Sequence, residues 1–104
     1  MDPSYESLEL VKRAKELAVK LGIADERVYI ITNKVNNKSN KILMEGLKER
    51  NLGANVVGSV RFDSKIEEAS MFGRPMIEYE GRAVRDVEEI ANKIVRIPIR
   101  YGFI

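Results

Sequence analysis

The sequence contains no cysteine and no histidine among its 104 residues. Without cysteine there are no disulfides and no thiolate metal sites, and without histidine there is no imidazole to act as a base or metal ligand near neutral pH. Thiol enzymes, Ser-His-Asp enzymes and metalloenzymes are therefore excluded within this chain. We expect no metal site.

Long hydrophobic runs are also missing. No apolar run approaches the ~20 residues that a membrane-spanning helix needs. The first residues, Met1 to Glu6, lack the basic and apolar regions of a signal peptide. We therefore expect a cytoplasmic protein without a membrane partner.

An excess of one charge is missing as well. The 18 basic and 16 acidic residues give a net charge of +2, and the two signs alternate along the chain. A dedicated nucleic-acid-binding domain usually carries a basic stripe, so this balance argues against a nucleic-acid partner. One local basic group keeps nucleic-acid binding open as a third hypothesis. It consists of Arg82, Arg85, Lys93, Arg96 and Arg100.

The central feature is an uncharged stretch at residues 28–32, Val-Tyr-Ile-Ile-Thr, followed by an Asn- and Lys-rich segment at residues 33–40. Five β-branched or aromatic residues in a row predict a strand that is buried on both faces of a parallel sheet. Ligands bind at the carboxyl ends of such strands. A binding site is therefore expected in the loop that begins at Asn33.

Four helices and a second strand are predicted around this strand. Asp2, Pro3 and Ser4 open the first helix and Gly22 ends it, and Ser39 or Asn40 caps the second helix. Residues 55–60 form the second strand. The third helix covers residues 65–71, and the fourth covers about 82–96.

Each long helix has an apolar face at helical spacing, which predicts the side that packs on the core. The first face consists of Leu10, Ala14, Leu17 and Leu21, flanked by Val11 and Ala18; the second of Ile42, Leu43 and Leu47; the last of Val84, Val87, Ile90, Ala91, Ile94 and Val95.

Strand, helix and strand in succession form a βαβ unit, so the two strands should be parallel. We predict one α/β domain over residues 1–104, a partial three-layer arrangement with two strands, or three if residues 76–79 form an edge strand. Such a sheet is narrow for parallel strands, which usually belong to wider sheets. Either a homodimer or a missing N-terminal half should complete it.

The order of short motifs resembles the C-terminal half of the MinD/ParA-like ATPases, P-loop NTPases with a deviant Walker A motif. The motifs are Asn33-Lys34-Val35 after the first strand, Gly58-x-Val60-x-Phe62-Asp63, Ile66-Glu67-Glu68-Ala69 and Gly73-Arg74-Pro75. The opening residues 2–8 resemble in particular the accessory ATPases that assist nickel insertion into carbon monoxide dehydrogenase.

This resemblance implies an adenine site for ATP or ADP. In that family, an Asn after one strand and a Pro-x-Asp segment after the next hold the base, and the matching positions are Asn33, Phe62 and Asp63. The stem of Lys34 could cover a face of the ring. An Asn amide offers the donor and the acceptor that the edge of adenine requires. Arg61 stands where the family usually has proline.

The same residues also fit purely structural roles. Asn33 is also suited to satisfying local backbone groups in a loop, and Asp63 to capping a helix. The lysines Lys34, Lys38 and Lys41 form either a solvated charge cluster or a contact for an anion.

The phosphate-binding parts of that family have no counterpart in this sequence. No Gly-Lys pair and no Gly-x-Gly-x-x-Gly motif occurs in the chain. Phosphoryl transfer depends on electrostatic stabilisation by such a loop and by Mg²⁺. The chain alone is therefore expected to lack ATPase activity.

The leading hypothesis is the nucleotide-base-binding half of an accessory ATPase of this type, with a client metalloenzyme as a possible partner. The alternative is a self-associating interaction module, or a relic fragment without nucleotide binding, because unpaired strand edges favour association.

Overall fold

The computed structural model describes residues 1–73 and 80–97 of the chain. Four α-helices flank two strands, and two short 3-10 helices precede the strands. The elements in order are α1 (Tyr5–Lys20), η1 (Asp25–Arg27), β1 (Ile30–Val35), α2 (Asn37–Glu49), η2 (Gly53–Asn55), β2 (Val56–Arg61), α3 (Ser64–Met71) and α4 (Arg82–Val95). The predicted α/β class is confirmed.

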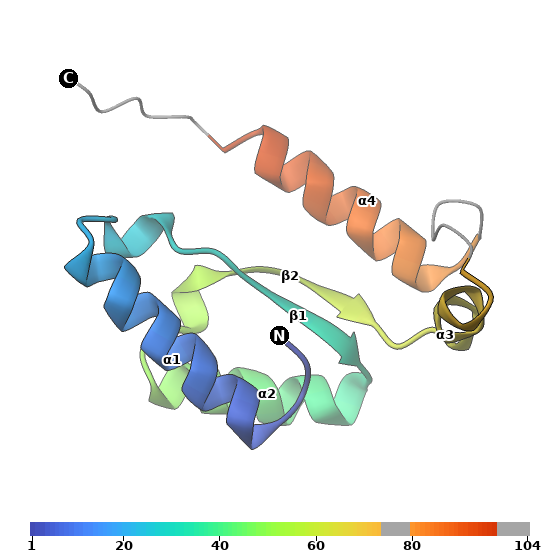
Figure 1. Cartoon of the computed structure of the whole chain (residues 1–104), viewed down its shortest axis with the longest axis horizontal. Coiled ribbons are helices and arrows are strands. Elements are labelled where there is room, and N and C mark those ends of the chain that lie inside the picture. The colour runs from blue at the N-terminus through green and yellow to red at the C-terminus, as the bar shows by residue number, and fades with distance from the viewer. Residues whose placement is uncertain (74–79, 98–104) are drawn as a thin grey trace.

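The two strands form a parallel sheet, with Ile30 opposite Val56 and Val35 opposite Arg61. Helix α4 covers one side of this sheet, whereas α1 and α2 lie on the other side (Figure 1). Within the described residues the sheet has two strands. The expected third strand at residues 76–79 lies outside the described residues, as does Arg100 of the basic group.

The prediction for the first strand is wrong at both ends, because β1 runs from Ile30 to Val35 rather than over residues 28–32. Strand β2 begins at Val56, opposite Ile30, so Val28 and Tyr29 have no partner in the ladder. The side chain of Asn55 instead donates to the carbonyl oxygen of Val28 at 2.8 Å. The ladder then continues to Val35, so residues 33–35 of the expected loop belong to the strand.

The helix ends follow local capping chemistry. Of the two expected caps of α1, Asp2 and Ser4, it is Ser4 whose side chain accepts a hydrogen bond from the backbone N–H of Ser7. Helix α2 begins earlier than predicted, because Asn36 caps it in a reciprocal pair of hydrogen bonds with Ser39. Asp63 caps α3, as expected.

The core has two parts, one on each side of the sheet. Beneath the sheet, towards α1 and α2, the buried side chains are Leu8, Ile30, Val35, Leu43, Leu47 and Leu52. Above it, under α4, they are Val60, Ala83 and Ile90. The upper part is smaller because α4 covers chiefly β2.

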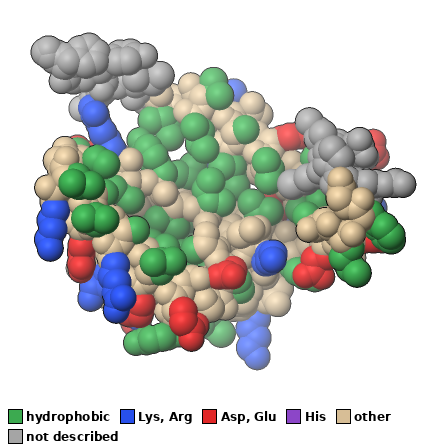
Figure 2. Space-filling view, viewed as in Figure 1, with side chains coloured by type: hydrophobic (Ala, Val, Ile, Leu, Met, Phe, Trp, Pro, Cys, Tyr) green, Lys and Arg blue, Asp and Glu red, His purple; other side chains and the backbone are tan. Residues whose placement is uncertain are grey.

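Several of the expected core-facing residues are exposed. On α1, Leu10 is 68% exposed and Leu21 is 73% exposed, because the helix packs through the side that carries Leu8. The prediction is also wrong for Ile42 of α2 and Val95 of α4. Figure 2 shows hydrophobic side chains on the face between α1 and α4.

None of the helices in the described ranges, 1–73 and 80–97, has the length and apolar character required to cross a bilayer.

Candidate functional site

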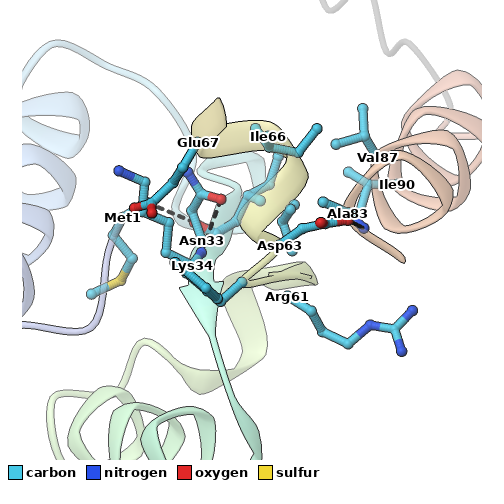
Figure 3. Close-up of a pocket in the computed structure, with 13 residues that line it drawn as sticks. Met1, Asn33, Lys34, Arg61, Asp63, Ile66, Glu67, Ala83, Val87 and Ile90 are labelled. Atoms are coloured by element: carbon cyan, nitrogen blue, oxygen red, sulfur yellow. Dashed lines mark hydrogen bonds between the residues drawn. The ribbon is translucent and has the colours of Figure 1, made fainter. Parts of the chain in front are cut away.

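A pocket of about 380 Å³ lies at the carboxyl ends of β1 and β2, bounded by α3 and α4 (Figure 3). Its volume falls within the usual range for small-molecule sites. All four residues predicted from the sequence line it, namely Asn33, Lys34, Phe62 and Asp63. The structure therefore brings together residues from the ends of two strands that are about 30 positions apart in the chain.

The walls of the pocket are mostly apolar. The lining includes Ile31, Val60, Phe62, Ile66, Ala83, Val87 and Ile90. Polar and charged residues lie among them: Asn33, Lys34, Arg61, Asp63 and Glu67. Apolar walls with a few polar groups suit a flat ligand that has hydrogen-bonding atoms along its edge.

An irregularity in β1 places Asn33 and Lys34 at this pocket. Lys34 has a φ of 57°, in the left-handed region that is uncommon for non-glycine residues. The ladder shifts register between Thr32 and Val35. The strict alternation of the strand is broken there, and two successive side chains are exposed between the buried Thr32 and Val35.

One hydrogen bond stabilises this turn. The Asn33 side-chain oxygen accepts from the backbone N–H of Lys34 at 2.9 Å. Asn33 therefore plays the local role that its residue type favours, and its side-chain NH₂ group has no protein acceptor among residues 1–73 and 80–97. Of the three lysines in the predicted cluster, Lys34 lines the pocket, whereas Lys38 and Lys41 do not.

The backbone of Asn33 is held by Met1. The backbone N–H of Asn33 donates to the carbonyl oxygen of Met1 at 2.6 Å, and the Met1 nitrogen donates to the carbonyl oxygen of Ile31 at 2.7 Å. This is the pattern of parallel strand pairing, on the edge of β1 opposite β2. Met1 thereby forms one side of the pocket.

Asp63 links two helix starts. One carboxylate oxygen accepts from the backbone N–H of Lys65 at 3.0 Å, and the other accepts from that of Ala83 at 3.4 Å. A carboxylate is favourable at the positive end of a helix, and here α3 and α4 both begin beside it. The capping role is thus confirmed. Both oxygens already have a hydrogen-bond donor.

Arg61 and Asp86 form a pair that sequence reasoning missed. The backbone N–H and Nε of Arg61 both donate to one oxygen of Asp86 at 2.9 Å, and Nη2 donates to the other at 3.0 Å. Partial burial acts to raise the pKa of Asp86. The hydrogen bonds and charge of Arg61 outweigh burial, so this pKa lies below its usual range.

The pair fixes α4 against the end of β2. A signal was present in the sequence: Asp86 lies three residues after Ala83 and four before Ile90, on a helix face that also carries apolar residues. A carboxylate on a buried face needs a cationic partner.

Two further contacts join α4 to β2 and to the segment after it. Arg82 Nε donates to the carbonyl oxygen of Phe62 at 2.9 Å. Lys93 Nζ donates to the carbonyl oxygen of Val57 at 3.4 Å. Two members of the predicted basic group therefore contact the protein's own backbone.

The described parts of the chain contain no group of three or more Asp and Glu side chains placed to hold a metal ion.

Comparison with known proteins finds relatives that are named as ATP-binding. The chain is 34% identical over 97 residues to a protein of Methanocaldococcus jannaschii named as an uncharacterized ATP-binding protein; the match covers 93% of this chain and 36% of the relative. A second protein of that organism with the same description is 31% identical over 96 residues, which are 90% of this chain and 37% of the relative.

The chain thus spans little more than a third of the length of these relatives. Their names state ATP binding and no further activity. No protein-family model matches the chain, and neither does any solved structure.

Proposed function

We propose that this chain is the base-binding part of an ATP-binding domain, and that the pocket at the ends of β1 and β2 receives the adenine of ATP or ADP. The observation that carries the proposal is the convergence of Asn33, Lys34, Phe62 and Asp63 on one pocket. The similarity to proteins named as ATP-binding supports it.

The chemistry of the pocket suits a purine. Apolar side chains such as Val60 and Ile66 offer contact to the faces of a ring. The Asn33 NH₂ group offers a donor to a ring nitrogen, and the stem of Lys34 and the ring of Phe62 can cover the base. The site residues therefore fit the base of the nucleotide.

The phosphates have no comparable site in this chain, because the sequence contains no glycine-rich phosphate loop. We therefore propose weak binding, with a Kd on the order of a millimolar, and no ATP hydrolysis by the chain alone. The finer assignment is part of the same proposal: a MinD/ParA-like accessory ATPase of the carbon monoxide dehydrogenase type, cytoplasmic, with a client metalloenzyme.

Competition binding tests the role of Asn33. A fluorescent ATP analogue is titrated with the protein and displaced by ATP, in the wild-type chain and in Asn33→Ala and Asn37→Ala. Asn37 begins α2 outside the pocket and serves as the matched control. We expect Asn33→Ala to weaken binding about fivefold to tenfold, as the loss of one hydrogen bond does, and Asn37→Ala to bind normally. Equal affinities in all three chains would contradict the proposal.

A second candidate function is association through the outer edge of β1, the edge opposite β2. The observation in its favour is that Met1 already pairs with this edge as a strand would. Tyr29, just before β1, is 47% exposed, and Leu17 on α1 is 58% exposed. A homodimer, or an N-terminal half of a longer chain, would cover these side chains.

Sedimentation velocity across a hundredfold range of concentration tests self-association. A sedimentation coefficient that rises with concentration would support the homodimer. A sedimentation coefficient that stays at the monomer value would rule out the homodimer. The edge of β1 would then have to pair with a different segment.

A further inference from the structure

The proposed base site has few free hydrogen-bond acceptors, because the side-chain oxygen of Asn33 is already bound. The Asn33 side-chain oxygen already accepts from the backbone N–H of Lys34. The amide is thereby oriented, and its NH₂ group is what it chiefly offers to a ligand. An adenine edge carries an acceptor ring nitrogen beside a donor amino group. A second residue must therefore accept from the amino group.

Few side chains around the pocket can accept a hydrogen bond. Lys34 and Arg61 carry donors only, and the guanidinium of Arg61 is bound to Asp86. The carboxylate of Asp63 is oriented by backbone N–H groups of α3 and α4, one on each oxygen. Among the acidic side chains that line the pocket, Glu67 is the one without a hydrogen-bond partner in the described ranges.

Glu67 lies in the first turn of α3, which starts directly after Asp63. Its carboxylate has no hydrogen bond or ion pair with any residue in the described ranges. In Figure 3, Glu67 and Asn33 lie on the side of the pocket near Met1, whereas Val87 and Ile90 lie on the opposite side. One polar edge thus faces one apolar wall.

We propose that Glu67 determines which base this pocket takes, by accepting a hydrogen bond from an exocyclic amino group while Asn33 donates to the neighbouring ring nitrogen. The inference rests on the proposed base-binding function. A carboxylate attracts an amino group and repels a carbonyl oxygen at the same position. The pocket should therefore prefer 6-aminopurines to 6-oxopurines.

The test compares AMP with IMP, which carries a carbonyl oxygen where AMP has the amino group. The Kd of each nucleotide is measured by amide chemical-shift titration for the wild-type chain, Glu67→Gln and Glu68→Gln. Glu68 is the next residue of α3, is exposed and does not line the pocket, so it is a matched control. A glutamine can donate as well as accept, so it tolerates either purine.

We expect the wild-type chain and Glu68→Gln to bind AMP about tenfold more tightly than IMP, in line with a hydrogen bond to a charged acceptor. The preference should fall to within about twofold in Glu67→Gln. If Glu67→Gln keeps the full preference for AMP, the role of Glu67 is wrong although the base site stands. If the wild-type chain binds neither nucleotide, both proposals are wrong. Thermal unfolding of each variant verifies that the fold is unchanged.

Discussion

Arg61 binds its partner through both its side chain and its backbone. The guanidinium and the backbone N–H of Arg61 donate to the carboxylate of Asp86. The segment that forms one wall of the pocket is thereby attached to α4.

The acid stability of the protein should depend on this pair. The pKa of Asp86 is lower in the folded chain than its usual value. The ionised carboxylate therefore stabilises the fold above the ordinary carboxyl pKa, and this stabilisation is lost as the pH falls below about 4.

Replacing Asp86 by asparagine should consequently lower the free energy of unfolding at pH 7 by about 1–3 kcal/mol. The effect comes from the lost charge of the acceptor, because asparagine keeps an oxygen for the backbone N–H of Arg61. It should lie at the lower end of this range, because the Arg61 side chain is 49% exposed and solvent weakens the ion pair. Urea unfolding at pH 7 and pH 3 measures the effect, which should shrink at pH 3. Glu88→Gln, on the exposed side of α4, is the control. An equal loss at both pH values would contradict the assignment.

The backbone conformation that places Lys34 at the pocket should lower the stability of the fold. A non-glycine residue at φ 57° is strained, whereas glycine adopts this conformation readily. We expect Lys34→Gly to raise the free energy of unfolding by up to ~1 kcal/mol and to weaken nucleotide binding, since the stem over the base is lost. Asn51→Gly is a matched control, because Asn51 has a φ of 58° and lies away from the pocket.

In Asn51→Gly the nucleotide affinity should be unchanged. Denaturant unfolding and a nucleotide titration on the same samples provide both readouts. A Lys34→Gly chain that binds nucleotide as tightly as the wild type would remove Lys34 from the site.

At the scale of elements, the position of α4 depends on a close approach to β2. A Cβ atom added at Gly58 would lie 2.6 Å from Cγ1 of Ile90. The absence of a side chain at Gly58 therefore lets α4 lie directly on the strand. Because α4 supplies Ala83, Val87 and Ile90 to the pocket, this packing also shapes the candidate site.

Gly58→Ala should push α4 away from the sheet and destabilise the protein by about 1–3 kcal/mol. Gly53→Ala is the matched control, because a Cβ there has its closest neighbour at 3.7 Å. Thermal unfolding of both variants tests the prediction. A Gly58→Ala protein as stable as Gly53→Ala would show that α4 does not pack as tightly as described.

The sequence was most informative about elements whose signals are local. Ser4 and Asp63 cap helices as predicted, and the parallel βαβ unit follows from the order of its parts. The prediction for β1 is wrong at both ends, because the limits of β1 depend on where β2 starts. That is not a local property of the sequence. The face of α1 was misjudged because helical spacing shows an apolar stripe but not what covers it.

At the scale of the whole molecule, the sequence indicates which residues meet at the pocket but not how they are bonded. The chemistry of strand ends and the family resemblance led to Asn33 and Asp63, and both line the pocket. The partner of Arg61 and the bond from Lys34 to Asn33 depend on tertiary packing and on an unusual φ angle. Neither has a reliable signature in a single sequence.

The apolar face between α1 and α4 is also a feature of the whole molecule. The matches cover little more than a third of each relative, and exposed residues such as Leu17 and Ile94 lie on helices beside a narrow sheet. Added apolar cover on the outer edge of β1 should stabilise the fold. We expect an extension of five strand-forming residues joined to Met1 to slow amide exchange at Tyr29 and Ile31, compared with a Gly-Ser extension of the same length. Equal exchange rates in the two chains would contradict a strand site at this edge.

The central claim is that the pocket at the ends of β1 and β2 binds an adenine base. The most direct measurement is a titration of the wild-type chain with ATP, followed residue by residue through its backbone amide signals. The account predicts shifts that saturate at millimolar ATP and centre on Asn33, Lys34, Phe62 and Asp63, with little change along the exposed side of α1. An absence of shifts at that concentration, or shifts confined to other surfaces, would contradict it.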